Sequence, residues 1–517
     1  MNPEDAPPLS PADHWLTRFM ILRLLGVVYA FAFLAAALQL VPLMGAHGLT
    51  PLDLMIRHYA AYFGSVGGAF TRAPSLFWFW HTDAALLIVS WAGFALACAV
   101  VLGFANSVAL LVLWALYMSI VHTGQIWYGY GWETQLLETG FLAVFLCPLL
   151  DPRPFGRRPP PTPVIWLFRW LIFRIMLGSG LIKLRGDPAW RDLTALFYHF
   201  ETQPIPNGLS RWFDFLPHGV LRGGVVFNHL AELAAPFFVF GPRLARRIAG
   251  GVIVLFQVVL ILSGNLSFLN WLTIVPALAC FDDDLWARIV PRCLARRAER
   301  AAADASPSMS GIYASWALAL AVALLSVAPV LNLLSPRQIM NTSFSYDPLD
   351  LVNTYGAFGS VTRERMTVVF QGTDSDSPHG GGAEWRDYPY LAQPVDVNRR
   401  PRQVAPYQPR LDWQMWFAAM GPPNRNYAWT LNLIWKLLHN DPGTLSLFGG
   451  NPFPDRPPRY IRAVLFRYRF APPDDPQRRW WIREPVEIWL RPLSVDTPEL
   501  QADLRSYGWL PPQDPVR

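Results

Sequence analysis

The chain has 517 residues, of which 52% are hydrophobic and only 15% are charged, with a formal net charge of +6. Soluble proteins average roughly 25% charged residues, so the composition argues against an ordinary soluble enzyme of this length. The 23 tryptophans favour a membrane protein, because the indole ring collects at membrane–water interfaces. The positive charge lies in no basic-aromatic stripe or nucleic-acid motif, which argues against a nucleic-acid partner.

Nine apolar runs come close to the roughly 20 residues that a membrane-spanning helix needs. They lie at about 20–42, 84–103, 106–122, 134–150, 164–183, 225–240, 248–263, 266–281 and 312–334. Several are short, so one or two could be re-entrant segments. The first run also resembles a signal peptide, since Arg18 and Arg23 precede its apolar core and three small residues follow from Ala35. We favour a retained span, because the run continues through Leu43.

Arginines collect in alternate loops between these runs. The loops after the fourth, sixth and eighth runs carry Arg153, Arg157 and Arg158; Arg243, Arg246 and Arg247; and Arg288, Arg292, Arg296, Arg297 and Arg300. Cytoplasmic loops concentrate positive charge, which predicts a cytoplasmic N-terminus. We therefore expect a polytopic domain at 1–334 and an extracytoplasmic domain at 335–517. Abundant Ala, Arg and Pro with almost no Lys suggest a bacterial chain, hence an inner membrane with a periplasmic C-terminus.

The connection at about 185–224 is longer than the other loops. Its residues 190–200 predict a short amphipathic helix, which would lie on the membrane surface or fold back into the bundle. Because this connection follows the fifth run, we expect it on the same side as the C-terminal domain.

The pattern changes after about residue 335. Alternating apolar residues at 367–370, 463–470 and 486–490 predict strands. Residues 413–419 and 429–438 favour helices. The fold class that follows is a membrane all-α helical bundle with a C-terminal soluble α+β or β-rich domain. The four cysteines lie outside that last domain and form no metal-binding spacing, so we expect no disulfide framework and no metal.

Charged residues inside apolar runs are the candidate site. A charge at the bilayer centre costs on the order of 3 kcal/mol or more, so it normally faces the bundle interior and has a partner. Under the predicted topology Glu133, Lys183, His229 and Glu232 approach the same membrane face, which predicts an outward polar cavity. The structural alternative is that Lys183 reaches the interface, while His229 and Glu232 form a packing motif. A matching structural pair would join Glu138 to Arg174, two charges that lie deeper in their runs.

Several strings resemble the lipase maturation factor family, in order, over about residues 75–495. They are Tyr130–Glu133, Leu136–Phe141, Phe173–Trp190, Trp190–Leu196, Tyr198–Pro204, Asn228–His229, Glu232–Leu233, Ser263–Trp271, Asn353–Phe358, Arg410–Gln414, Asn451–Pro454 and Tyr460–Arg462. The resemblance implies a multi-pass protein that resides, in animals, in the endoplasmic reticulum membrane and helps lipases assemble as active homodimers. Its longest signature makes Trp190, Asp192, His199 and Glu201 candidates for client or ligand binding.

The partners implied are membrane lipids and an exported client protein. A bacterial chain need not act on a lipase, so the client stays open, and no cofactor motif identifies a cofactor.

A second, shorter resemblance concerns residues 180–190, which are similar to a segment of vitamin K-dependent gamma-glutamyl carboxylase and its transmembrane relatives. It implies an alternative function: a membrane enzyme with Lys183 as catalytic base, aided by Glu133, His229 and Glu232 in one cavity. Replacement of Lys183 by Arg would then abolish activity and leave insertion intact. A transporter is a third candidate, for which no internal repeat is visible.

Overall fold

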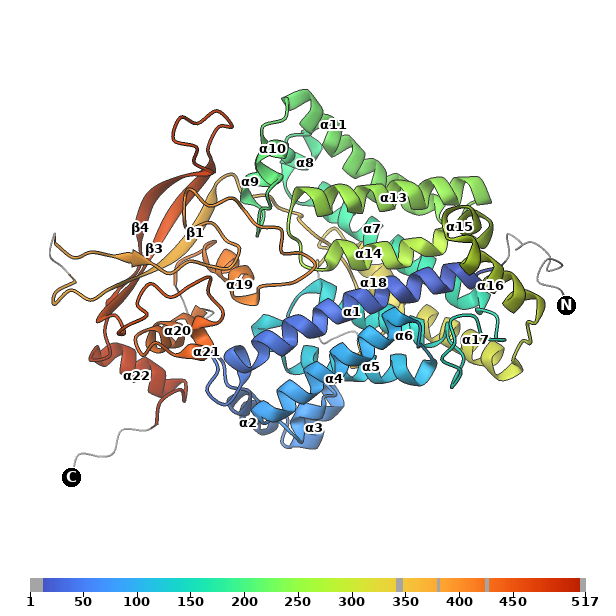
Figure 1. Ribbon diagram of the computed structural model, residues 1–517, viewed down its shortest axis with the longest axis horizontal. Coiled ribbons are helices and arrows are strands. Elements are labelled where there is room, and N and C mark those ends of the chain that lie inside the picture. Colours follow the sequence, from blue (N-terminus) through green and yellow to red (C-terminus); the bar gives the residue numbers. More distant parts are fainter. Residues whose placement is uncertain (1–12, 341–346, 379–381, 424–426, 512–517) are drawn as a thin grey trace.

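A computed structural model describes residues 13–340, 347–378, 382–423 and 427–511. Its helices form an elongated bundle, and a small antiparallel sheet with several helices packs on one end of it (Figure 1). This confirms a mainly helical membrane domain followed by a small sheet-containing region.

Five helical segments are long and apolar enough to cross a membrane. They are α1 (Trp15–Met44), α4 (Asp83–Leu102), α7 (Thr162–Arg185), α13 (Arg243–Ser263) and the nearly continuous pair α17 (Met309–Leu325) and α18 (Val327–Leu334). Close packing within the bundle depends on small residues: a Cβ added to Gly93 of α4 would lie 2.2 Å from the ring of Phe33 on α1. Glycine at this position therefore lets the two helices touch along their length.

The other predicted spans correspond to shorter helices. They are α5 (Ser107–Thr123), α6 (Gly131–Val144), the run of α11 (His218–His229), π-helical η3 (Leu230–Ala234) and α12 (Ala235–Phe238), and α14 (Leu269–Ala277) with η4 (Leu278–Cys280). At 1.5 Å per residue the 14-residue α6 measures about 21 Å, less than the roughly 30 Å hydrocarbon core. The predicted count of nine membrane spans is thus not confirmed. Hydropathy does not distinguish a helix that faces lipid from one that neighbouring helices bury, and α6 is buried along nearly its whole length.

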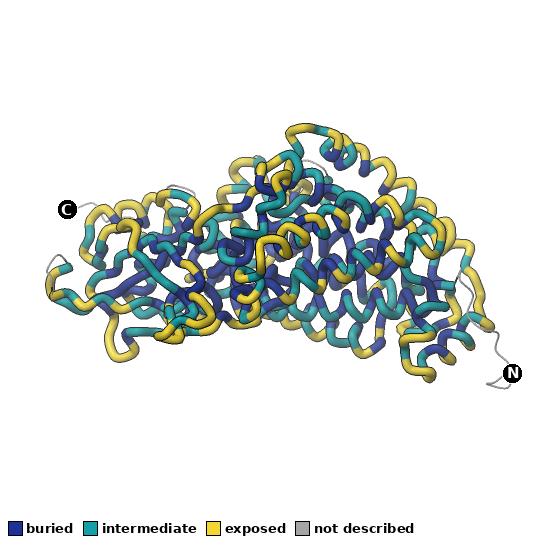
Figure 2. Tube along the Cα trace, turned by 90° about the horizontal axis from the view of Figure 1, so that it is seen from above, coloured by how far each residue is buried: buried dark blue, intermediate teal, exposed yellow. Residues whose placement is uncertain are grey.

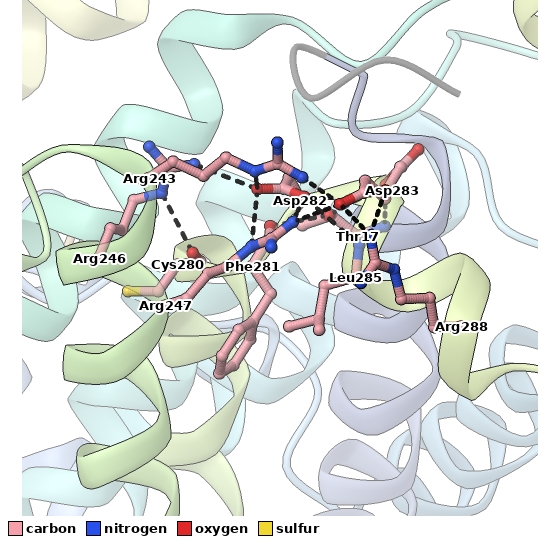
Figure 3. A network of polar contacts seen from close by, with 11 residues as sticks. Thr17, Arg243, Arg246, Arg247, Cys280, Phe281, Asp282, Asp283, Leu285 and Arg288 are labelled. Atoms are coloured by element: carbon pink, nitrogen blue, oxygen red, sulfur yellow. Dashed lines mark hydrogen bonds and ion pairs between the residues drawn. The ribbon is translucent and has the colours of Figure 1, made fainter. Parts of the chain in front are cut away.

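The arginine-rich loops gather at the end of the bundle where α1 begins. The Arg18 guanidinium donates to the Arg158 carbonyl over 2.9 Å, and the Asp283 carboxylate accepts from the Thr17 amide over 3.0 Å. Next to Asp283, Arg247 donates to Asp282 over 3.1 Å. This bond belongs to a network in which several arginines bind two aspartates (Figure 3). Two further helices continue from this network, α15 (Asp283–Ile289) and α16 (Arg292–Ala303).

Short helices form the connections at the other end. They are α2 (Leu52–Tyr62), α3 (Val66–Arg72), η1 (Leu76–Trp78), η2 (Gln125–Trp127), α8 (Pro188–Arg191), α9 (Leu196–Thr202) and α10 (Ser210–Asp214). The predicted helix at 190–200 is therefore broken in two. Leu193 takes φ = +58° between the halves, a left-handed conformation that no helix accommodates.

The C-terminal region contains a four-stranded antiparallel sheet in the order β2-β1-β3-β4. Its elements are β1 (Arg365–Thr373), β2 (Arg386–Asp387), α19 (Arg410–Ala418), α20 (Trp429–Leu437), α21 (Pro442–Leu445), β3 (Tyr460–Phe470), β4 (Trp481–Leu493) and α22 (Pro498–Ser506). All three predicted strands and both predicted helices of this region are confirmed. Val368 of β1 pairs with Leu465 of β3 at the centre of the sheet.

One hydrophobic core runs through both regions. It includes Trp132 of the bundle and Trp413 of α19, whose rings meet edge to face with centroids 4.9 Å apart. The buried trace in Figure 2 likewise continues from the helices into the sheet region. The sheet region is therefore packed on the bundle as part of the same core, while the boundary at 334/335 stays a prediction.

Candidate functional site

A buried ion pair joins the bundle to α19. Arg410 Nη1 lies 2.8 Å from Glu133 Oε1, and neither side chain has any exposed surface. The Tyr117 hydroxyl donates to the other Glu133 oxygen, and the Arg410 guanidinium lies 3.4 Å from the centre of the Tyr128 ring. Two opposite charges removed from water are tolerated only as a closely paired and hydrogen-bonded set.

Polar side chains of the bundle also bind the backbone that leads into α19. Gln39 of α1 accepts from the Arg410 amide over 2.8 Å and donates to the Gln408 carbonyl over 2.8 Å. Asn265 accepts from the amides of Val404 and Ala405, each over 2.9 Å. Buried peptide groups need such partners, so the bundle determines the path of the chain into α19.

A second buried pair lies at the start of the C-terminal region. Glu138 of α6 binds the Arg174 guanidinium, and it also accepts from the Tyr355 hydroxyl over 2.6 Å and from the Asn353 amide over 2.9 Å. Arg174 donates in turn to the Asn353 carbonyl over 2.6 Å. The expected Glu138–Arg174 pair is confirmed, and it holds residues 353–355 against the bundle.

Lys183 and Glu232 form the third buried pair. Lys183 Nζ lies 2.5 and 2.6 Å from the two Glu232 oxygens, and Asn228 donates to the same carboxylate over 2.9 Å. The ammonium also lies 5.2 Å from the centre of the Trp190 ring, within cation–π range. Glu232 lies in the π-helical turn η3, and such turns are frequent at functional sites because they change the direction of the side chains that follow.

The two histidines of this region are both engaged. His229 Nε2 donates to the Trp190 carbonyl over 3.0 Å, which fixes its ring beside the lysine pair. His199 is buried against Phe358, with ring centroids 5.1 Å apart. Burial, together with the nearby Lys183 charge, lowers the pKa of His199 to about 4, so this imidazole is neutral at physiological pH.

The structure brings together three of the four predicted catalytic residues. Lys183 and Glu232 are paired, and His229 contacts the same tryptophan. Glu133 has the separate partners Arg410 and Tyr117, so the structure does not bring it into this cluster. Glu232 is also the direct counter-charge of Lys183, and the carboxylase-like hypothesis did not predict this pairing.

The predicted client-binding residues are mostly used within the protein. Trp190 and His199 are buried, with 2% and 6% of their surface exposed. Glu201 is half-buried and accepts from the Phe470 amide over 2.9 Å, whereas Asp192 is exposed. Only Asp192 of the four is therefore readily available to a partner, and their role in client binding stays a prediction.

Sequence reasoning gave no role to several residues that make these contacts. Besides Gln39, Asn265 and Arg410, Arg365 of β1 donates to the carbonyls of Gln203 and Pro204 over 2.5 and 3.1 Å. An available signal was the presence of an amide side chain inside an apolar run, at Gln39. Within the described ranges, no three His, Cys, Asp or Glu side chains are grouped so as to hold a metal ion.

Fold and buried contacts together define a multi-pass membrane protein whose C-terminal α+β region is packed on one end of its helices. The protein-family model of the lipase maturation factor transmembrane domain matches residues 16–288. The family model of the lipase maturation factor C-terminal domain matches residues 351–490. The chain belongs to the lipase maturation factor family.

Individual relatives match over nearly the full length. The chain is 46% identical to "Lipase maturation factor 1" of Bos taurus, over 96% of this chain and 91% of the relative. It is 43% identical to "Lipase maturation factor 1" of Homo sapiens, over 97% and 91%, and 28% identical to human "Lipase maturation factor 2", over 95% and 85%. No solved structure matches the chain. These findings do not favour the carboxylase-like alternative.

Proposed function

We propose that the chain is a membrane-resident maturation factor for an exported lipase. The observation that carries this function is the 46% identity, over 96% of the chain, to a protein named for lipase maturation. The packing of the C-terminal region supports this function. The buried Glu133–Arg410 pair, and the bonds of Glu138 to Asn353 and Tyr355, hold its chain at defined positions on the bundle.

A secretion assay tests this function. We expect co-expression of the chain with a dimeric lipase, in cells that lack their own maturation factor, to raise secreted lipase activity severalfold. The amount of lipase protein synthesised should stay constant, because maturation acts after synthesis. Lipase activity per unit of secreted antigen is the measurement, and a secreted control enzyme outside the lipase class should not respond. Equal lipase activity with and without the chain would refute the proposal.

The proposed sidedness puts the C-terminal region outside the cytoplasm. The positions of the two regions support it: the arginine-rich loops lie at the start of α1, and the C-terminal region lies at its other end. The reported relatives are animal proteins, so they do not support the expectation of a bacterial inner membrane, which was drawn from composition.

Reporter fusions after residue 340 test the sidedness. An export-dependent phosphatase fused there should be active, and a second fusion after Arg300 should be inactive, because the two positions flank the last long apolar segment. The opposite pair of activities would reverse the topology.

A further inference from the structure

A cavity of about 870 Å³ lies where the C-terminal region meets the ends of two long helices. Its walls include Met44 at the end of α1, Asp83 at the start of α4, and Lys436 on α20. Because α1 and α4 are long enough to cross a membrane, their ends mark the level at which the chain leaves the hydrocarbon. Phe79 and Trp80 next to this wall are 69% and 45% exposed, as expected of aromatic residues at a membrane–water interface.

The acidic side of the cavity carries two aspartates in different states. Asp53 forms an ion pair with Arg57, and its other oxygen lies 3.5 Å from His81 Nε2. Asp83 accepts from the Ala46 amide through Oδ1 over 2.7 Å. In the described part of the chain no hydrogen bond or ion pair reaches the second Asp83 oxygen, so the carboxylate of this lining residue keeps one acceptor without a cationic partner.

Arg57 is already paired with Asp53, so, of the residues that the structure describes, the free basic group of the wall is Lys436, one of only two lysines in the sequence. Its side chain is half-buried, and among the described residues its ammonium makes no hydrogen bond or ion pair. Burial lowers the pKa of Lys436, and the charge of Asp441 offsets this only in part. Lysine carries a compact charge suited to a phosphate oxygen, so an anionic group in the cavity would supply the missing partner.

Aromatic and apolar groups complete the lining. Trp435 and Trp509 belong to the cavity wall, as do Met44 and Leu52. Indole rings attract ammonium groups through their π faces, and a volume of this size lies in the range that small-molecule ligands occupy. The described residues of the cavity therefore offer one unpaired cation besides the Arg57–Asp53 pair, one unpaired carboxylate oxygen, two indoles and an apolar edge at the membrane boundary.

We propose that this cavity binds the zwitterionic head group of a phospholipid, with the phosphate at Lys436 and the ammonium at Asp83 and the two tryptophans. A head group of this kind carries both charges that the walls complement, and its acyl chains would continue along the apolar edge into the bilayer. An anionic lipid without an ammonium group would leave Asp83 unpaired. The site is distinct from the three buried pairs and does not depend on the direction of the chain across the membrane.

Native mass spectrometry of the purified full-length chain in a neutral sugar detergent tests this site. The probes are phosphatidylethanolamine, phosphatidylcholine, phosphatidylglycerol and the soluble head group phosphoethanolamine, at matched concentrations. We expect the zwitterionic lipids to bind at least tenfold more tightly than phosphatidylglycerol. Lys436→Gln should weaken every lipid about tenfold, as expected for loss of one charged hydrogen bond. Asp83→Asn should remove only the preference over phosphatidylglycerol.

The control variant is Arg478→Gln. It removes one exposed positive charge of the C-terminal region that does not line the cavity. It should bind all lipids normally, and the thermal unfolding temperatures of the three variants should agree. Equal binding of all lipids, or unchanged binding by Lys436→Gln, would overturn the proposal. Soluble phosphoethanolamine that binds as tightly as the lipid would assign the cavity to a soluble phosphoester instead, and would overturn the lipid assignment.

Discussion

Replacement of Arg410 by Met should cost about 3–5 kcal/mol of folding free energy, because it leaves the Glu133 charge buried without its partner. Lipase maturation should fall to background, since α19 starts at this residue and depends on the pair for its position on the bundle. The measurements are thermal unfolding in detergent and the specific activity of a co-expressed secreted lipase.

Two controls separate the buried pair from a general effect of lost charge. Arg363→Met breaks the pair with Asp187, another link between the bundle and the C-terminal region, in which the arginine side chain is 46% exposed. The arginine end of this pair reaches solvent, and solvent-accessible pairs contribute about 0–1 kcal/mol, so this variant should remain far more stable than Arg410→Met and stay active. The double variant Arg410→Met with Glu133→Leu should recover much of the lost stability, because no unpaired charge remains. A stable, fully active Arg410→Met single variant would contradict the prediction.

The Lys183–Glu232 pair should also prove structural. Lys183→Met alone should cost about 3–5 kcal/mol, because the Glu232 carboxylate would keep only the Asn228 amide as a partner. Lys183→Met combined with Glu232→Met should recover most of that stability and also most of the maturation activity. Thermal unfolding and the same lipase assay measure both quantities.

The double variant separates a structural role from a chemical one. If Lys183 acts as a base, the double variant will be stable and inactive, since a thioether cannot accept the proton. Lys183→Arg adds a second test, because the carboxylase-like hypothesis predicts complete loss of activity there. A structural pair should retain partial activity, since arginine keeps the charge but changes its geometry. A stable and inactive double variant would revive the enzymatic alternative.

Much of the architecture can be predicted from local sequence patterns. Long apolar runs identified the five long membrane helices, although they also predicted four spans that are not confirmed, and alternating residues such as Val368 within β1 identified the strands. The Glu138–Arg174 pair was also predictable, because two charges inside apolar runs need each other. The resemblance to the family rested on strings such as Arg410–Gln414 and is confirmed by the family models.

The partners of most buried charges depended on tertiary packing. Glu133 meets Arg410, 277 residues further along the chain, and nothing in the local pattern of either residue names the other. The break at Leu193 and the π-helical turn at Glu232 were likewise not predicted from the local pattern.

Composition and hydropathy thus decided which segments leave water, because transfer free energy adds residue by residue. Which helices face lipid, and which charge neutralises which, followed from packing in three dimensions. The burial of α6 and the pairing of Glu133 with Arg410 depend on how distant segments pack against one another. A local sequence pattern carries no information about that packing.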